Sequence, residues 1–164
     1  MPDPAIETPA TRAAAQAGLD ARVVATEPPS SAEESARLQG IDVGRLLRTI
    51  VIRRGAEDYV FVLVPGGRQI DWKKLRSHLS ERRLSLPDAT EALSATGYER
   101  GAITPFGATS AWPVLADISI RGLGTVAIGA GARGVNLHVD AGALISALDA
   151  DEADVTAPPR SARA

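Results

Sequence analysis

A glycine-rich segment, Thr96–Gly107 (TGYERGAITPFG), has the composition of a loop that can do chemistry with its backbone. Its three glycines permit positive φ angles and close approach by another molecule, and Pro105 fixes the direction in which the chain leaves. Such a loop can aim several N–H groups at one point, which suits a carbonyl or an oxyanion. An ordinary surface turn has the same composition, so both interpretations stay open.

A second glycine cluster, Gly129–Gly134 (GAGARG), lies between two expected strands. Its spacing differs from that of the dinucleotide-binding fingerprint, and a strand follows it where that motif needs a helix. A Rossmann-type nucleotide site is therefore excluded. A tight turn between strands and a loop that contacts a ligand would both fit.

Side-chain candidates for catalysis are few. The absence of cysteine excludes disulfides, a thiolate metal site and a cysteine nucleophile. His78 is expected on a helix surface, and we expect no metal site from the two histidines. His138 alternates with Asn136 and Asp140 on one strand face, which could line a cleft or face solvent. A Ser/His/Asp triad has no positive support.

The elements that must position these residues follow from caps and hydrophobic periodicity. Two clear strands, 48–54 and 59–65, are joined by residues 55–58 as an antiparallel hairpin. The second strand is apolar on both faces, so we expect it to be central. Further strands are expected at 21–26, 83–86, 113–118, 125–129 and 134–139, and helices at 9–18, 31–40, 72–79, 88–94 and 141–148.

This order of elements indicates an α+β protein, because helices come mostly first and strands gather in the middle and at the end. We expect a mixed, mostly antiparallel, curved or barrel-like sheet with peripheral helices. One domain is expected over residues 1–156, followed by a disordered tail over residues 157–164.

Charge is unevenly distributed along the chain. The formal net charge is −2, but residues 45–100 carry 11 Lys and Arg against 7 Asp and Glu. A weakly basic region on an acidic protein fits a short contact with phosphate, or an ordinary solvated surface. We see no signal-peptide core and no apolar run of membrane-spanning length, so we expect a cytoplasmic protein with no membrane partner.

Five segments in register carry a family resemblance: PPSSAEE at 28–34, RTIV at 48–51, VPGGRQID at 64–71, TGYERGAITP at 96–105 and IGAGARG at 128–134. Together they resemble the YbaK and proline-tRNA-synthetase-associated editing domains, over residues 8–156. The resemblance implies a mixed α+β fold with a barrel-like sheet. It also implies an enzyme acting in trans, which hydrolyses the ester between a wrong amino acid and the 3′-terminal adenosine of tRNA.

The implied substrates are mischarged tRNAs such as Cys-tRNA(Pro) and Ala-tRNA(Pro), and a synthetase is an implied further partner. No cofactor, metal or protein nucleophile is implied. A ribose hydroxyl of the substrate or a water molecule attacks, while backbone amides of the loops hold the carbonyl.

The resemblance also implies a set of site residues. Gly101 and Arg48 take the catalytic roles, the first at the scissile carbonyl and the second at a terminal phosphate or ribose. The substrate-binding candidates are Thr49, Thr104, Pro105, Gly131 and Asn136, with His138 added from its position on the strand face of Asn136.

One residue departs from the family pattern, because Arg48 stands where the family usually has lysine. Arginine stays protonated and so cannot act as a general base, but its planar fork binds phosphate well. A deacylase is the leading hypothesis. The alternatives are a non-catalytic protein that binds the tRNA 3′ end or an adenosine-containing ligand in the same cleft, and a different small-molecule hydrolase on this fold.

Overall fold

The computed structural model describes residues 6–158. Two 3₁₀ turns, Val43–Arg45 and Arg121–Leu123, accompany the regular elements. In chain order these are α1 (Pro9–Gln16), β1 (Arg22–Ala25), α2 (Ala32–Gln39), β2 (Leu46–Gly55), β3 (Asp58–Pro65), β4 (Gln69–Ile70), α3 (Trp72–Leu79), α4 (Ala89–Thr96), β5 (Val114–Asp117), β6 (Thr125–Gly129), β7 (Val135–Asp140), α5 (Ala141–Ala147), β8 (Asp151–Ala153) and β9 (Thr156–Ala157).

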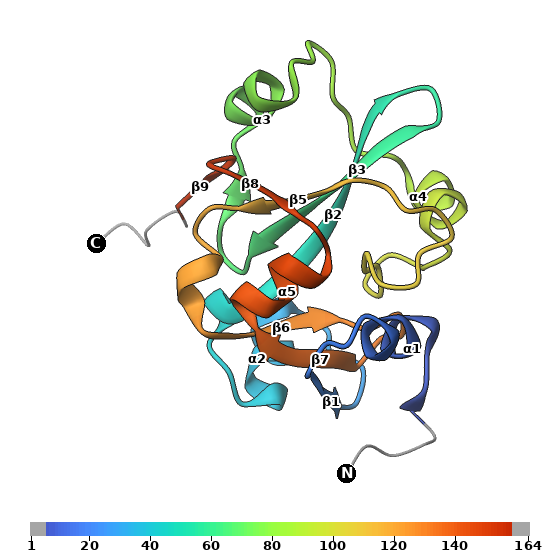
Figure 1. Cartoon of the computed structure of the whole chain (residues 1–164), viewed down its shortest axis with the longest axis vertical. Coiled ribbons are helices and arrows are strands. Elements are labelled where there is room, and N and C mark those ends of the chain that lie inside the picture. Colours follow the sequence, from blue (N-terminus) through green and yellow to red (C-terminus); the bar gives the residue numbers. More distant parts are fainter. Residues whose placement is uncertain (1–5, 159–164) are drawn as a thin grey trace.

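Seven strands form one sheet in the order β1-β7-β6-β2-β3-β5-β8, and β4 pairs with β9 beside it. The antiparallel ladders β1–β7, β7–β6 and β2–β3 are longer than the parallel ladders β6–β2, β3–β5 and β5–β8. Figure 1 shows β2 running from the half of the molecule that holds β1, β6 and β7 to the half that holds β3, β5 and β8. The predicted α+β class with a mixed, mostly antiparallel sheet is confirmed.

The helices begin where the sequence places a polar cap. In each case the side-chain oxygen of the cap accepts a hydrogen bond from a backbone N–H in the first turn, which that turn cannot otherwise satisfy. α2 and α4 end at glycines with φ of 71° and 82°, a conformation that glycine adopts without strain. The caps are Thr8, Ser31, Asp71, Asp88 and Asp140.

β3 is the centre of the core, as its apolar sequence predicts. Phe61 and Leu63 pack into the larger cluster, with residues of α1, α5, β6 and β7. Val60 and Val62 face the other way, toward Leu75 of α3. All five side chains are at most 2% exposed, and each such burial contributes about 1.5–3 kcal/mol.

Two sequence predictions fail in the later part of the chain. The strand expected at 83–86 is wrong: Ser85 alone forms a bridge, with Arg53. Of its two alternating leucines, Leu84 packs against the cluster of Val60, Val62 and Leu75, but Leu86 is 58% exposed. No strand was expected after the helix at 141–148, but β8 follows it and pairs with β5. Acidic residues in β8 (DEA) gave no strand signal.

The tail expected to be disordered spans residues 157–164, and the structure describes only residues 157 and 158 of it. Ala157, at the start of the expected tail, pairs with Gln69 in the small sheet, and residues 159–164 lie outside the described part of the chain. His78, which was expected to be a surface residue, has its Nε2 2.7 Å from Asp151 Oδ2 of β8. No helix between residues 6 and 158 has the length and apolar character needed to span a bilayer.

Candidate functional site

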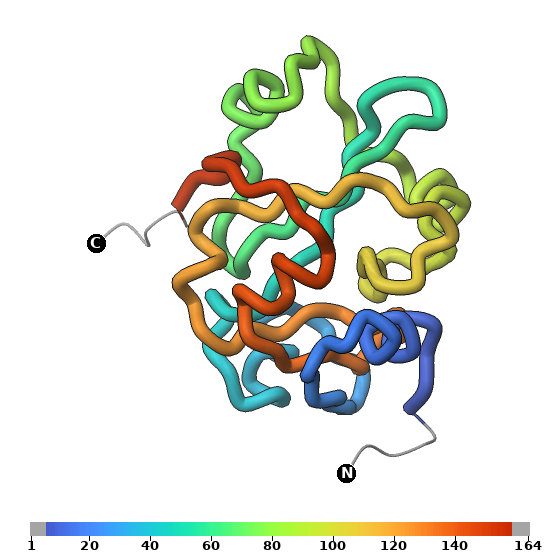
Figure 2. The backbone as a smooth tube through the Cα atoms, viewed as in Figure 1, coloured from blue at the N-terminus to red at the C-terminus, as the bar shows by residue number. Residues whose placement is uncertain are grey.

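A pocket of about 390 Å³ opens between β2, the start of α2 and two glycine loops. One loop contributes Arg100, Gly101 and Ile103, and the other, between β6 and β7, contributes residues 132–134. Figure 2 shows that the first loop lies beside α1, far from it in sequence. The two segments approach closely at Gly107. A Cβ at this position would lie 2.6 Å from the Pro9 carbonyl oxygen, so a side chain there would prevent the approach.

The charged residues that line the pocket are all arginines. Arg48, Arg100 and Arg133 come from three separate segments, and no aspartate or glutamate lines the pocket within residues 6–158. Three cations around a cavity without a carboxylate create a positive potential that favours anionic ligands, phosphates above all.

The N-terminus of α2 adds to this potential. Ser30, Ser31 and Ala32 line the pocket, whereas the acidic residues of the same turn do not. The Ser31 hydroxyl accepts from the Glu34 N–H at 3.0 Å and so satisfies one amide of the first turn. Within residues 6–158 the Ala32 N–H has no acceptor. A free amide and the positive end of the helix dipole point to an anion site at this rim.

The loop of Gly101 is held by its own hydrogen bonds. The Tyr98 hydroxyl donates to the Phe106 carbonyl at 2.7 Å, and the Thr96 hydroxyl accepts from the Tyr98 N–H at 3.1 Å. Gly101 has φ of 92°, which explains the glycine there. The N–H groups of Gly101 and Ile103 donate no hydrogen bond to any residue that the structure describes, so both are available to a ligand.

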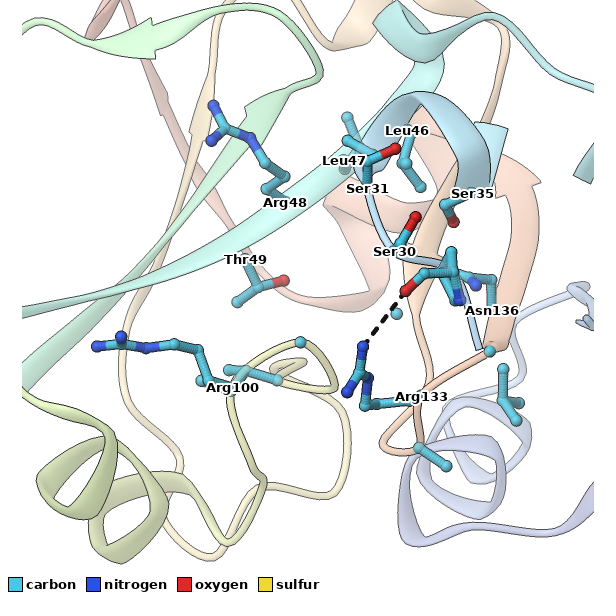
Figure 3. Close-up of a pocket in the computed structure, with 18 of the residues that line it drawn as sticks. Ser30, Ser31, Ser35, Leu46, Leu47, Arg48, Thr49, Arg100, Arg133 and Asn136 are labelled. Atoms are coloured by element: carbon cyan, nitrogen blue, oxygen red, sulfur yellow. Dashed lines mark hydrogen bonds between the residues drawn. The ribbon is translucent and has the colours of Figure 1, made fainter. Parts of the chain in front are cut away.

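Thr49 presents the clearest unsatisfied group in the pocket. Its Oγ1 is buried and has no hydrogen-bond partner among the described residues. Figure 3 shows this hydroxyl turned toward the middle of the pocket. A buried hydroxyl without a partner costs about 1–3 kcal/mol, so a ligand that paired with it would recover that free energy.

Arg48 lies on the opposite face of β2 from Thr49, as strand alternation predicts. Its Nη2 donates to the carbonyl oxygen of Arg68, and Figure 3 shows the guanidinium pointing away from Thr49 and Arg133. To bind a ligand at the centre of the pocket, the Arg48 side chain must first release Arg68.

Arg68 itself is fixed by a buried carboxylate. Its Nε lies 3.8 Å from Oδ2 of Asp117, which is 0% exposed, and 2.7 Å from the Thr156 hydroxyl. Burial opposes the ionisation of Asp117, but hydrogen bonds from Ser119 and from the Val155 N–H hold the pKa of Asp117 below its ordinary value. The residue whose carbonyl accepts from Arg48 is therefore itself held by a buried carboxylate and by the Thr156 hydroxyl.

The other two arginines contact neighbouring segments. Nη2 of Arg133 donates to the Pro29 carbonyl at 3.3 Å, which links the β6–β7 loop to the start of α2. Nη2 of Arg100 donates to the Pro87 carbonyl at 3.3 Å. The first bond places the Arg133 guanidinium at the rim, whereas the second directs the Arg100 guanidinium toward Pro87, outside the lining. Sequence reasoning missed both residues. The available signal was an arginine directly before a glycine in each glycine loop.

The structure brings four of the predicted site residues together at the pocket and leaves four outside it. The four in the lining are Arg48, Thr49, Gly101 and Asn136, and the four outside are Thr104, Pro105, Gly131 and His138. The serines at the start of α2 line the pocket without having been predicted.

Three of the four outside residues have structural partners instead. Thr104 is 0% exposed and accepts from the Phe106 N–H at 3.4 Å, beside the half-buried Pro105. A Cβ on Gly131 would lie 2.8 Å from the Tyr98 ring, so this glycine permits close packing.

His138 is buried beneath α2 rather than exposed to a cleft. Its Nε2 lies 2.9 Å from Gln39 Oε1. Burial, together with the nearby charge of Arg22, lowers the pKa of His138, so the imidazole is neutral near pH 7. The expected polar face is therefore divided, with Asn136 at the pocket, His138 in the interior and Asp140 capping α5.

Metal ligands are not grouped in this structure. Within residues 6–158, no cluster of three or more His, Asp or Glu side chains is arranged to hold a metal ion.

A family model described as the aminoacyl-tRNA editing domain matches residues 26–147, which include every residue that lines the pocket. The chain belongs to this family. The resemblance seen in the sequence motifs is thus confirmed, and the editing-domain family supports a deacylase as the general class of protein.

Named relatives agree with that membership. The editing domain is 26% identical over 131 residues to EbsC of Enterococcus faecalis, provisionally named a Cys-tRNA(Pro)/Cys-tRNA(Cys) deacylase, covering 80% of each chain. It is 29% identical over 106 residues to the proline–tRNA ligase of Thermotoga maritima, covering 65% of this chain but 18% of the ligase. The chain therefore corresponds to about a fifth of the length of such a ligase.

Solved structures share the fold. A crystal structure described provisionally as a trans-editing enzyme for prolyl-tRNA synthetase superposes with a TM-score of 0.82 at 23% identity, covering 93% of this chain and 99% of that one. A hypothetical protein gives a TM-score of 0.84 at 21% identity, covering 92% and 100%. The editing domain thus has the fold of that family.

Proposed function

We propose that this editing domain removes a wrong amino acid from tRNA in trans, by hydrolysing the ester to the 3′-terminal adenosine. The observation that carries the proposal is the pocket, whose lining within residues 6–158 has three arginines and no carboxylate and so suits the phosphates of a nucleic acid end. Its volume of about 390 Å³ is within the usual range for a small-molecule site.

The residues at the pocket divide the work between binding and polarisation. Arg133, the Ala32 N–H and Arg100 bind phosphate at the rim. The Thr49 hydroxyl forms a hydrogen bond to the ribose or to the aminoacyl group. The N–H groups of Gly101 and Ile103 hold the ester carbonyl and stabilise the oxyanion that forms there.

The attacking group comes from the substrate or from water. Among residues 6–158 the lining offers hydroxyls and arginines, but no His, Lys, Asp or Glu that could take a proton from a hydroxyl. In direct hydrolysis a water oxygen bonds to the carbonyl carbon and gives its proton to solvent, and the bond to the ester ribose oxygen breaks. If the free ribose hydroxyl attacks first, the amino acid moves to that hydroxyl, and water then hydrolyses the new ester in the same way. The ribose oxygen that leaves takes a proton from solvent, which gives a free amino acid and an intact tRNA.

The proposed substrates are Cys-tRNA(Pro) and Ala-tRNA(Pro). The name of the Enterococcus faecalis relative and the occurrence of similar domains in proline–tRNA ligases support tRNA(Pro) as the carrier. A synthetase that charges this tRNA is the proposed partner, and the cytoplasm, where both are found, is the proposed location.

A deacylation panel tests the proposal. Purified protein is incubated with alanyl-, cysteinyl- and seryl-tRNA(Pro), and kcat/KM is compared between wild type, Arg133→Ala and Arg22→Ala. Loss of one charge-assisted hydrogen bond costs about 1.5–3 kcal/mol, so Arg133→Ala should lower kcat/KM about tenfold or more. Arg22 is exposed outside the lining and serves as the control. A wild type that binds these tRNAs but leaves all of them charged would contradict hydrolysis.

A non-catalytic binder is the second candidate, and the position of Arg48 favours it. Its guanidinium is held by the Arg68 carbonyl rather than directed into the pocket. Arg48→Lys separates the two functions. If the wild type is inactive and the lysine variant hydrolyses aminoacyl-tRNA, the chain is a binder that has lost the reaction.

A further inference from the structure

A second basic surface lies at the other end of β2, which we name the arginine groove. The tip of the β2–β3 hairpin, α3 and the segment after it enclose a groove of about 650 Å³. Figure 1 shows α3, the hairpin tip and the segment between α3 and α4 at one end of the molecule. Within the described residues no carboxylate lines this groove. Its charged residues are Arg53, Arg54, Arg76, Arg82 and Arg83.

Three of these five arginines form no ion pair with a residue that the structure describes. Arg53 Nε lies 3.3 Å from Glu91 and Arg54 Nη2 lies 3.1 Å from Asp58, so two are neutralised. The remaining three are exposed and have no carboxylate within 4.0 Å among residues 6–158; they are Arg76, Arg82 and Arg83. Glu81 lies in an adjoining hollow but forms no ion pair in the described structure. Gathered like charges repel, so this arrangement suits an anionic partner better than it suits stability.

The groove is structurally defined rather than a set of free side chains. The Arg53 N–H donates to the Ser85 carbonyl at 2.8 Å, and the Ser85 N–H donates to the Arg53 carbonyl at 3.2 Å. This bridge holds the segment with Arg82 and Arg83 against β2. The lining is arginine without lysine, and arginine binds phosphate with two parallel N–H groups.

One free edge of β2 connects the pocket and the groove. β6 pairs with Leu46 and Leu47, and beyond them that edge carries no strand until Ser85 bridges Arg53. From Thr49 to Arg54, five residues at about 3.3 Å each give about 17 Å. Arg100 lies between them, since it lines the pocket and donates to the carbonyl of Pro87, two residues after Ser85.

We infer that the arginine groove binds the phosphate backbone of the tRNA whose 3′ end enters the pocket. The inference rests on the proposed function for the pocket. One strand of a nucleic acid duplex rises about 3.4 Å per nucleotide, so roughly five nucleotides cover the 17 Å between the two sites. The contacts are to backbone phosphates, so they are independent of base sequence and weaken with salt.

Binding measurements with two RNA lengths test this role. The variant Arg76→Ala/Arg82→Ala/Arg83→Ala is compared with wild type and with Arg12→Ala/Arg22→Ala/Arg121→Ala. The control triple removes the same charge from exposed positions outside both cavities. The probes are an uncharged tRNA(Pro) transcript and the single-stranded trinucleotide CCA, which is too short to reach from the pocket to the groove. Binding is measured by fluorescence anisotropy from 50 to 300 mM salt.

We expect the groove variant to bind tRNA with an affinity lower by about tenfold or more at 150 mM salt. The slope of log K against log salt concentration should be less negative than that of wild type by about two to three. The control triple should bind tRNA with the affinity of wild type. Both triple variants should bind the short oligonucleotide as tightly as wild type does. If the groove variant is destabilised in thermal unfolding, Arg82→Ala/Arg83→Ala repeats the test in the loop alone.

Three results would overturn the inference: tRNA affinity and salt slope equal to wild type, equal weakening of both probes, or no tRNA binding by wild type. Loss of binding to phosphatidylserine vesicles without loss of tRNA binding would assign the groove to a membrane surface instead. Because uncharged tRNA is the probe, the result is separate from hydrolysis. A wild type that binds through the groove and cleaves no ester refutes the deacylase but not the groove.

Discussion

Thr49→Val should raise the stability of the protein while lowering its activity. Valine keeps the β-branched shape and the strand preference of threonine and replaces the hydroxyl with a methyl group. That hydroxyl is buried without a partner among the described residues, so its removal ends a desolvation cost.

The expected gain follows from the environment of the hydroxyl. Unsatisfied buried hydroxyls cost about 1–3 kcal/mol, and we take the lower end because Thr49 lies at a pocket open to water. About 1 kcal/mol corresponds to a rise in Tm of about 2–4 °C in a protein of this size. The hydrogen bond lost to the bound substrate, about 0.5–1.5 kcal/mol, should lower kcat/KM roughly two- to twelvefold.

A matched threonine gives the opposite sign for stability. Thr96 is 0% exposed, and its hydroxyl donates to the Ala92 carbonyl at 2.8 Å and accepts from the Tyr98 N–H at 3.1 Å. Thr96→Val leaves that N–H unpaired and should lower the free energy of unfolding by about 1–3 kcal/mol. Urea unfolding of both variants, with single-turnover deacylation of the first, makes the comparison. Equal destabilisation of the two variants, with full activity in Thr49→Val, would refute the reasoning.

Two further predictions concern buried ionisable groups. Asp117→Asn should lower the free energy of unfolding at pH 7 by about 1.5–3 kcal/mol, measured in urea, because hydrogen bonds to a charged group are lost. The folded pKa of Asp117 is depressed, so this contribution is fully present above the unfolded pKa of 3.8 and disappears as the pH falls through the folded pKa. A stability difference between wild type and Asp117→Asn that persists fully at pH 2 would contradict this cause. The pKa of His138 is lowered below 6.5, so below that pH the unfolded chain binds the proton first and the native state loses stability. The Tm of His138→Gln should therefore fall less than that of wild type between pH 7.5 and 5. If Tm falls equally with pH in the two proteins, His138 is not the group responsible.

Much of the local structure could be predicted because its causes are local. A cap acts on N–H groups two or three residues away, so Ser31 and Asp71 mark their helices in the sequence itself. β3 is apolar on both faces, which predicts its central position before any partner is known. The strand expected at 83–86 failed because its backbone meets a partner only at Ser85, and because Leu86 stays exposed although Leu84 packs on the core.

The sequence by itself determined the helix caps, the hairpin, the glycine loops and, through five motifs in register, the family. Only the tertiary structure decided which side chains reach the pocket. Arg133 meets the start of α2 across 104 residues, and Gln39 buries His138 across 99. Strand alternation assigned Thr49 and Arg48 to opposite faces of β2, but the Arg68 carbonyl and the empty surroundings of the Thr49 hydroxyl come from distant segments. Burial and charge sum over whatever packs together in space, and spacing along the chain does not contain that sum.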